Sequence, residues 1–268
     1  MKLKGKVCIV TGSSAGIGKQ SAIRLAEDGA DVVLAARRLE RLEETAKICQ
    51  EKGVRTLCVQ ADITKHEDRQ KIVDQTIEKF GTIDVLVNNA HGGELPISKS
   101  VQEGYFTTFS FIDTPISFYE HFMKGNLYST VEMMQLCIPY MKGKEDASII
   151  NFSSSASIGI KGIGAGRVAF GTAKGAVAVM SRIAAYELGE LGIRVNCIYP
   201  TAVTDSMTEA IDNQYMSAVM QALAVNPLKR AGDSYRDIAP VVSFLASEDS
   251  RFITGSAFYC EGGGWMSM

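Results

Sequence analysis

Metal-ligand spacings, paired cysteines and long apolar runs are all missing from this sequence. It has three histidines and six cysteines, with no CxxC pair, no HExxH motif and no Cys/His cluster. We therefore expect no metal site, and we interpret the cysteines as buried, reduced thiols. No apolar run approaches the roughly 18 residues that a membrane-spanning helix requires. The start of the sequence leads directly into a strand-like segment, so we expect no signal peptide.

Neither sign of charge dominates the chain. Lys and Arg number 28 and Asp and Glu number 30, which gives a net charge of −2. This balance gives no general attraction to nucleic acid or to an anionic membrane, so we expect neither as a partner. Hydrophobic residues make up 46% of the 268 residues, which is typical of a globular protein. No linker or repeat divides the sequence, and we expect one cytoplasmic domain over residues 1–268.

Short apolar runs alternate with longer amphipathic stretches. We expect strands at Val7–Thr11, Asp31–Ala36, Thr56–Gln60, Ile83–Asn88, Ser148–Ser153, Arg194–Tyr199 and Ala257–Cys260. We expect helices at Gly16–Asp28, Leu39–Lys52, His66–Phe80, Tyr119–Met141, Val168–Leu191 and Asp237–Ser247, and an irregular segment at Gly92–Ser117. Uniformly apolar strands separated by helices indicate a parallel sheet covered on both faces. The predicted fold class is therefore α/β, a Rossmann-like doubly wound sheet with ligands at the carboxyl ends of its strands.

A glycine-rich turn, Thr11-Gly-Ser-Ser-Ala-Gly-Ile-Gly18, joins the first expected strand to the first expected helix. Gly12 permits a tight turn, Gly16 lets the backbone approach a pyrophosphate, and Gly18 lets the helix pack closely on the sheet. The helix N-terminus adds free N–H groups. A plain loop is the alternative, but the strand–turn–helix context favours a dinucleotide site. Its expected residues are Gly12, Ser13, Ser14, Gly16, Ile17 and Gly18.

The end of the second expected strand bears on the choice of cofactor. NAD sites usually place a carboxylate there for the ribose 2′-hydroxyl, and this chain has Ala36 followed by Arg37 and Arg38. Guanidinium groups are suited to a 2′-phosphate. A solvated arginine pair is the alternative. We expect NADP(H) rather than NAD(H), with Arg37 and Arg38 as ligands.

Motifs along essentially the whole chain resemble the short-chain dehydrogenase/reductase family. They are the TGxxxGIG turn, Asp62, Asn88-Asn89-Ala90, a late Ser…Lys pair, Arg194–Pro200, and Gly255 with Glu261-Gly262-Gly263. The resemblance implies a single Rossmann-like domain, a nicotinamide cofactor, a small-molecule substrate and a homotetramer or homodimer.

The resemblance also assigns cofactor contacts to particular residues. It places Asp62 and Ile63 beside the adenine, Asn89 by the ribose and Val203 beside the nicotinamide. It also implies that Ala90, Lys174 and Pro200 contact the cofactor. Two structural interpretations stay open. Asp62 could be the N-cap of the following helix, and Asn88 could tie neighbouring strands together through its amide.

The family's chemistry uses Asn, Ser, Tyr and Lys, and the resemblance maps three of them to Asn126, Ser154 and Lys174. Ser155 is the alternative serine if the register slips by one. The YxxxK motif reads Phe170-Gly-Thr-Ala-Lys174, so Phe170 stands where the family has its proton-transferring tyrosine. Loss of a general acid typically costs about 10²–10⁴ in rate.

Two interpretations of Phe170 compete. The other three members of the set are intact, which favours an isolated Tyr-to-Phe change, introduced to disable proton transfer. Natural divergence is the alternative, and other departures from the family pattern support it: His91 replaces a glycine, Thr201 replaces another, and Asp205 stands at a common threonine position. The side chains that could replace the missing donor are His91, Tyr199, Tyr128 and Tyr105.

Two variable segments, at about 92–118 and 204–228, are expected to bind the substrate. They are rich in aromatic residues and methionine, which indicates an adaptable apolar pocket, although packing between subunits would explain the aromatics equally well. We expect a bulky ketone or alcohol, such as a steroid or polyphenol, bound near His91, Ser154, Phe170 and Tyr199. The alternatives are a cofactor-binding pseudoenzyme, acting as a sensor or assembly subunit, and an enoyl reductase or isomerase.

Overall fold

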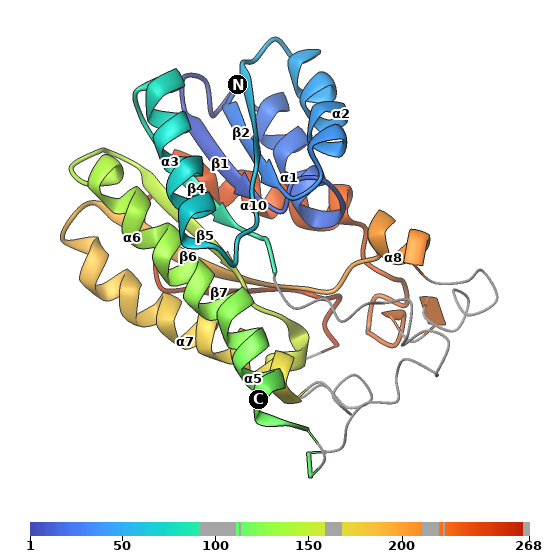
Figure 1. Cartoon of the computed structure of the whole chain (residues 1–268). Coiled ribbons are helices and arrows are strands. Elements are labelled where there is room, and N and C mark those ends of the chain that lie inside the picture. The colour runs from blue at the N-terminus through green and yellow to red at the C-terminus, as the bar shows by residue number, and fades with distance from the viewer. Residues whose placement is uncertain (92–110, 113, 159–167, 211–219, 222, 265–268) are drawn as a thin grey trace.

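A single parallel sheet organises the computed structural model, which describes residues 1–91, 111–112, 114–158, 168–210, 220–221 and 223–264. Its seven strands lie in the order β3-β2-β1-β4-β5-β6-β7 (Figure 1). They are β1 (Val7–Thr11), β2 (Asp31–Ala36), β3 (Thr56–Gln60), β4 (Val85–Asn88), β5 (Ala147–Phe152), β6 (Ile193–Pro200) and β7 (Ala257–Cys260). The predicted doubly wound α/β fold is confirmed.

Helices connect successive strands and cover both faces of the sheet. They are α1 (Gly16–Glu27), α2 (Leu39–Gln50), α3 (His66–Phe80), α5 (Ile116–Phe122), α6 (Ser129–Met141), α7 (Val168–Gly189), α8 (Asp205–Ala210) and α10 (Ala239–Ala246). Shorter helical turns are the π-helical segments Met123–Tyr128 and Ser234–Ile238 and the 3₁₀ segments Ser155–Ile158 and Glu248–Ser250.

Alternation along the strands creates two cores. On β1, Cys8 and Val10 face one core, which also contains residues of α1, α2 and α10. Val7 and Ile9 face the other, which contains residues of α3, α6 and α7. Because successive strand side chains point to opposite faces, a strand that is buried on both sides must be apolar at every position. This explains why the strands could be located from short apolar runs.

The longest helix, α7, is long and apolar enough to cross a membrane by length and composition alone. Its buried residues include Ala173, Val177 and Ala185, and it packs closely against β6. The apolar composition of α7 is therefore accounted for by packing within the domain.

Several predicted boundaries needed correction. The helix predicted over Tyr119–Met141 begins earlier, at Ile116 after the extended Pro115, and contains the π-helical segment between α5 and α6. The irregular segment predicted to reach Ser117 therefore ends at Pro115, and its residues 92–110 and 113 lie outside the described part. The predicted Asp237–Ser247 helix is preceded by a π-helical turn that starts at Ser234.

The six cysteines all lie in the described part of the chain, and none forms a disulfide. Burial raises the pKa of Cys49 to about 12 and that of Cys197 to about 11. Thiols with raised pKa values form little thiolate and react slowly. The predicted burial is confirmed for four of the cysteines, whereas Cys58 and Cys260 are only partly buried.

The chain reverses its direction of travel across the sheet between β1 and β4. From β1 it proceeds outward to β2 and β3, and it then returns to build β4 and the following strands on the other side of β1. In such sheets the crevice outside the carboxyl ends of the two central strands is where ligands bind. The glycine-rich turn follows β1 at this crevice, and Asn89 follows β4.

Candidate active site

The glycine-rich turn is held in place by residues after β4. The amides of Asn89 and Ala90 donate to the Thr11 hydroxyl at 3.1 and 3.0 Å, and the Asn89 side chain donates to the Thr11 carbonyl at 2.9 Å. Gly12 has a φ of +71°, and a Cβ on Gly18 would lie 2.3 Å from the Gly12 carbonyl oxygen. Side chains at these positions are therefore excluded, and Asn89, which was expected near the ribose, fixes the shape of the turn.

The start of α1 presents an anion-binding surface. Its N-cap, Ala15, has no side chain that could cap the helix, and α1 has no acidic residue in its first turn. Ser13 is buried, and its Oγ has no hydrogen-bond partner among the described residues. The Gly16 amide donates to a carboxylate oxygen of Asp205 from α8. An anionic group is thus already bound where a dinucleotide's diphosphate would bind, so these residues fit such a cofactor.

The edge of the crevice beyond β2 is basic. Arg37 and Arg38 are exposed, and the Gln60 side chain donates to the Arg37 carbonyl at 3.0 Å. Ala36 ends the strand, so position 36 offers no carboxylate to a ribose. The arginines lie where the sequence analysis placed them, and their role toward a 2′-phosphate stays a prediction.

Asp62 shapes the turn after β3, with Ile63 beside it. Its Oδ1 accepts hydrogen bonds from the Thr64 amide and hydroxyl at 2.9 and 2.8 Å. Partial burial raises the pKa of Asp62, but the Thr64 hydrogen bonds and the charge of Arg37 outweigh it, so the net shift is downward. The N-cap of α3 is Lys65, so the interpretation of Asp62 as the helix N-cap is wrong. Its contact with an adenine stays a prediction.

Asn88, the last residue of β4, ties neighbouring strands together through its side-chain amide, as one of the two interpretations of this residue predicted. Its side chain donates to Asn151 Oδ1 on β5 at 2.9 Å, and Asn151 donates in turn to the Ser181 hydroxyl on α7 at 2.8 Å. These buried amides fix the distance between β4, β5 and α7, and α7 carries two of the candidate catalytic positions.

Asn126 lies in the π-helical segment between α5 and α6. It is 1% exposed, and its Nδ2 donates to the Phe122 carbonyl at 2.9 Å. The Ser129 hydroxyl donates to the Gly125 carbonyl at 3.0 Å, so side chains take up carbonyls that an α-helix would satisfy internally. Such π-turns inside helices frequently mark functional sites. The sequence pattern predicted the residue but not the unusual turn that holds it.

Ser154 follows β5 and is partly buried. Its hydroxyl accepts a hydrogen bond from the Ala156 amide at 3.2 Å. A Cβ on Gly171 would lie 2.8 Å from the Ala156 carbonyl oxygen, so this segment packs directly on the first turns of α7. The close approach places the segment after Ser154 against the turn of α7 that carries Phe170. The alternative serine, Ser155, is buried.

Lys174 and Phe170 lie one turn apart on α7. The Lys174 ammonium is 6.0 Å from the centre of the Phe170 ring and donates to the Phe152 carbonyl at 2.9 Å. Lys174 is 5% exposed, and burial lowers its pKa to about 8. The Phe170 ring packs edge-on against Phe122, with 5.7 Å between ring centroids. The buried Lys174 ammonium thus lies close to the Phe170 ring, which lacks the hydroxyl of a tyrosine.

Pro200 ends β6, and the segment after it is tightly anchored. The Thr201 hydroxyl donates to the Ser155 hydroxyl at 3.2 Å. The Val203 amide donates to the Gly232 carbonyl at 2.9 Å, and the Ser234 hydroxyl donates to the Val203 carbonyl at 2.9 Å. The positions expected beside the nicotinamide are therefore fixed by the backbone around them. Sequence reasoning noted Thr201 and Asp205 only as departures and missed their contacts.

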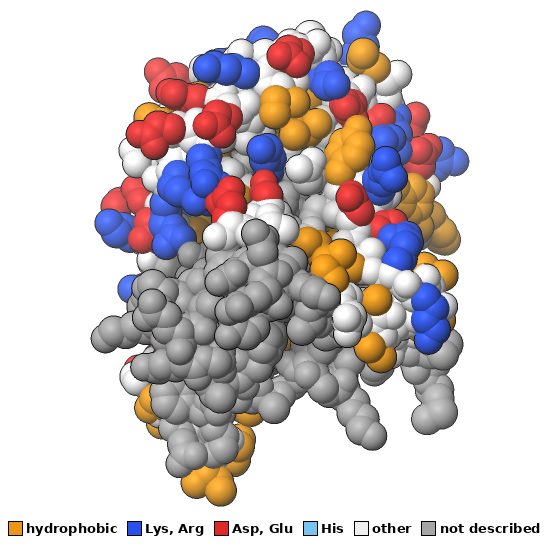
Figure 2. Space-filling model, turned by 90° about the vertical axis from the view of Figure 1, so that its right-hand side faces the viewer, with side chains coloured by type: hydrophobic (Ala, Val, Ile, Leu, Met, Phe, Trp, Pro, Cys, Tyr) orange, Lys and Arg blue, Asp and Glu red, His pale blue; other side chains and the backbone are white. Residues whose placement is uncertain are grey.

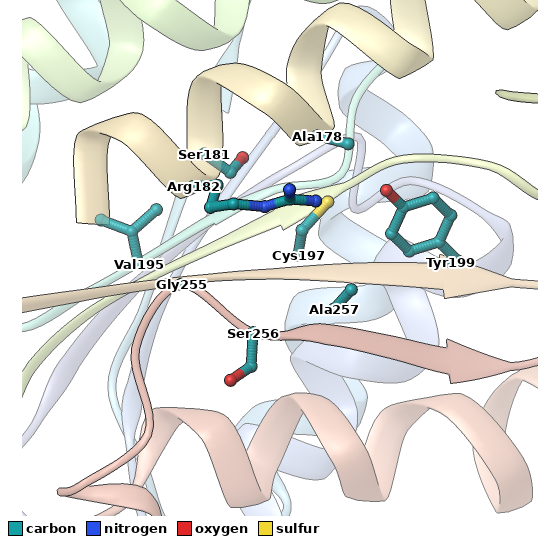
Figure 3. A pocket seen from close by; sticks show the side chains of 9 residues that line it. All are labelled: Ala178, Ser181, Arg182, Val195, Cys197, Tyr199, Gly255, Ser256 and Ala257. Atoms are coloured by element: carbon teal, nitrogen blue, oxygen red, sulfur yellow. The ribbon is translucent and has the colours of Figure 1, made fainter. Parts of the chain in front are cut away.

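The candidate replacement donors that the structure describes belong to different elements. His91 is exposed after β4, Tyr128 is 57% exposed on the π-helical segment, and Tyr105 lies outside the described residues. Figure 3 shows the Tyr199 hydroxyl directed toward α7, in a cavity of about 10 Å³ that also borders Arg182. Burial raises the pKa of Tyr199 to about 12, which makes it a weak acid. Its role in binding substrate stays a prediction.

Comparison with known proteins defines the class to which this crevice belongs. A family model described as enoyl-(acyl carrier protein) reductase matches residues 12–264. The curated relative (2S)-[(R)-hydroxy(phenyl)methyl]succinyl-CoA dehydrogenase subunit BbsD of Thauera aromatica is 34% identical over 266 residues, which are 98% of each chain. The fold and these matches define a Rossmann-type oxidoreductase.

Solved structures agree with this class. A 7α-hydroxysteroid dehydrogenase complexed with NADH and 7-oxo glycochenodeoxycholic acid superposes with a TM-score of 0.84 at 29% identity, covering 99% of this chain and 96% of that one. A short-chain dehydrogenase from Burkholderia cenocepacia in complex with NADP has a TM-score of 0.82 at 27% identity, covering 98% and 99%. The chain belongs to the short-chain dehydrogenase/reductase family.

Proposed function

We propose that the chain is an NADP(H)-dependent oxidoreductase that interconverts a ketone and a secondary alcohol on a bulky apolar substrate, with its activity strongly reduced by Phe170. One observation carries this proposal. The buried Lys174 ammonium lies 6.0 Å from the centre of the ring at position 170. Positive charge at this place stabilises negative charge on an oxygen held beside the ring.

The chain's own residues divide the remaining work. A bound nicotinamide would supply or accept the hydride at its C4 atom. Lys174 would hold the ribose hydroxyls, and the Ser154 hydroxyl would donate to the substrate oxygen. Asn126 would position a water between Lys174 and solvent. Phe170 provides shape and no proton, so this position cannot protonate the substrate oxygen.

Restoring the hydroxyl tests the function. With Phe170→Tyr we expect NADPH-dependent reduction of at least one member of a panel of cyclic and aryl ketones, at about 10²–10⁴ times the rate of the unaltered chain. Consumption of NADPH, followed by its absorbance, is the measurement. No gain across a broad panel would contradict the proposal.

The choice of NADP(H) over NAD(H) rests on Arg37 and Arg38, which are exposed at the end of β2. We expect NADPH to bind more tightly than NADH, and Arg37→Ala with Arg38→Ala to weaken NADPH binding by about tenfold or more while NADH binding changes little. Calorimetric titration measures both affinities. Arg251→Ala, an exposed arginine after α10, is the control. Equal affinities in the unaltered chain would contradict the assignment.

A bulky apolar substrate is supported by the aromatic side chains near position 170. The Phe118 and Phe122 rings pack edge-on with 5.7 Å between centroids, and Phe122 contacts Phe170 in the same way. Two relatives act on ring compounds by their names, a phenyl-bearing succinyl-CoA and a bile-acid derivative. Residues 92–110, 113, 211–219 and 222 of the two substrate segments lie outside the described residues, so the part of these segments in binding stays a proposal.

A second candidate is a cofactor-binding subunit without turnover of its own. It is favoured by Phe170 itself and by the BbsD relative, whose name describes a subunit of a dehydrogenase. Tight NADPH binding without turnover, even in Phe170→Tyr, would select this function.

Enoyl reduction or isomerisation is a third candidate, because the matching family model is described as an enoyl reductase. His91 or Tyr199 would then serve as the donor. Product analysis with NADPH deuterated at C4 distinguishes the two reductions, since deuterium appears on a carbinol carbon in one and on an alkyl carbon in the other. An isomerisation would leave the cofactor unconsumed.

We also propose that the protein is cytoplasmic and assembles as a homodimer or homotetramer. Val179, Ile183 and Tyr186 are 57%, 57% and 88% exposed and follow one another at helical spacing along α7. An apolar stripe of this kind on the surface suits contact with another copy.

A further inference from the structure

Helix α8 places one carboxylate against the start of α1, where a dinucleotide's diphosphate would bind, and a second against α2. Asp205 accepts a hydrogen bond from the Gly16 amide at the start of α1. Glu209, one turn further along α8, pairs with Arg41 on α2 at 2.9 Å. In Figure 1, α8 lies beside the end of α1 that faces the crevice. The two contacts therefore hold α8 across the mouth of the cofactor site.

The contact at Gly16 is the important one. Backbone amides at a helix N-terminus, together with the helix dipole, attract a diphosphate. One amide cannot serve a carboxylate and a diphosphate oxygen at the same time, and two anions at this distance repel each other. Bound cofactor must therefore displace the Asp205 carboxylate from Gly16.

We propose that Asp205 is a determinant of cofactor affinity that acts as a competitor: its carboxylate occupies the diphosphate position until the cofactor expels it. The inference rests on the proposed cofactor binding and adds a step to it. Asp205 stands where the family commonly has an uncharged threonine, so the competition is a property of this chain.

The surroundings of α8 allow such a displacement. The chain is anchored up to Val203, whose amide and carbonyl are bound by Gly232 and Ser234 at 2.9 Å each. Beyond this anchor only Thr204 separates the fixed backbone from α8. A cleft of about 400 Å³ opens between Gly16, Asp205, Thr208 and residues 231–235. This cleft gives a displaced Asp205 side chain open space beside α1.

Figure 2 looks onto the side of the molecule that lies at the right in Figure 1, where α2 and α8 are, and shows acidic and basic side chains interspersed. No large field of one sign is seen over the described part of this face. The effect of Asp205 on a bound phosphate is therefore a local one, and a nearby carboxylate without a contact to α1 should not reproduce it.

The test compares cofactor binding to the unaltered chain and to Asp205→Asn, which keeps the size of the side chain and removes its charge. Calorimetry with NADPH and with ADP, at one ionic strength, gives the affinities. We expect Asp205→Asn to bind both ligands about tenfold more tightly. Glu209→Gln, which loosens the second contact, should give a smaller gain of about threefold. Glu40→Gln, an exposed carboxylate on the first turn of α2, should change neither affinity by more than about twofold.

ADP carries a diphosphate and no nicotinamide, so a gain for ADP assigns the competition to the diphosphate position. A gain for NADPH alone would place Asp205 at the nicotinamide and overturn the inference. Equal affinities of Asp205→Asn and the unaltered chain would overturn it while leaving the proposed function intact. Failure of both chains to bind any nicotinamide dinucleotide would overturn the proposed function and this inference together. Binding by Asp205→Asn alone would support both.

Discussion

Lys174 holds its ammonium group in a buried position, 2.9 Å from the Phe152 carbonyl, although the tyrosine that it would serve is a phenylalanine. Burial lowers the pKa of Lys174 from 10.5 to about 8. The protein therefore keeps a costly charged group at a position where packing alone would favour an apolar side chain. The burial of the charged Lys174 side chain is the strongest indication from a single residue that this position serves catalysis.

The destabilisation caused by burying the Lys174 charge can be measured through the pH dependence of the free energy of unfolding. Between pH 8 and pH 10.5 the unfolded chain binds more protons at Lys174 than the folded chain, so the contribution of this residue to stability rises with pH. Lys174→Met removes this dependence. We expect the variant to be more stable at pH 7 by about 2 kcal/mol, and the advantage to shrink as the pH approaches 10.5.

Denaturant unfolding of both chains at several pH values between 7 and 10.5 checks this. Lys47→Met, an exposed lysine on α2, is the control and should show no pH-dependent difference. A constant difference between Lys174→Met and the unaltered chain would contradict the lowered pKa.

Individual site residues differ in how well the sequence revealed them. Gly12, Asn126 and Lys174 could be located because their spacing matches a family pattern. The contact between Gly16 and Asp205 joins residues 189 positions apart, and no local pattern carries that information. Asp62 was open to two interpretations, and only the backbone geometry excluded the helix N-cap.

At the scale of elements, the glycine turn and α1 act as one unit. A Cβ on Gly18 would lie 2.3 Å from the Gly12 carbonyl oxygen and 2.4 Å from Asn89 Nδ2. We expect Gly18→Ala to destabilise the fold by about 2 kcal/mol and to weaken NADPH binding by at least about tenfold, because backbone and Asn89 must both move.

Gly189 at the end of α7 offers a matched control, since a Cβ there meets nothing within 4 Å. Gly189→Ala should stabilise the helix by up to about 1 kcal/mol and leave NADPH binding unchanged. Thermal unfolding and cofactor titration on both variants check the pair. Normal cofactor binding by Gly18→Ala would show that the turn is not the cofactor cradle.

The elements themselves were largely predictable. Strands buried on both faces must be apolar throughout, so β1 to β7 stand out as short runs. The π-helical segment Met123–Tyr128 could not be predicted, because a single helical pattern covers α5 and α6 and nothing in it shows where an extra residue enters the turn. The observed ends of several helices differ from the predicted ends by a few residues.

At the scale of the whole molecule, one sheet brings distant segments to a single edge, and α7 leaves an apolar stripe outside. Ile183 is 57% exposed in the middle of this stripe. We expect the unaltered chain to have a mass of two or four times 29.0 kDa in solution, and Ile183→Glu to reduce it toward one copy, because a buried charge opposes assembly.

Sedimentation equilibrium measures these masses, and circular dichroism confirms that the variant is folded. Lys47→Glu introduces an acidic residue on the exposed face of α2 and should leave the mass unchanged. An unaltered chain that is a monomer at all concentrations would contradict the proposed assembly.

The central claim is that the chain has a complete nicotinamide site from which one hydroxyl is missing. The most direct test is the transfer of deuterium from C4-labelled NADPH to a ketone by Phe170→Tyr, with Phe170→Tyr/Lys174→Met as the matched control. We expect labelled alcohol from Phe170→Tyr, and at least about 10²-fold less from the double variant and from the unaltered chain. Tight NADPH binding by Phe170→Tyr with no label transferred to any ketone would contradict it.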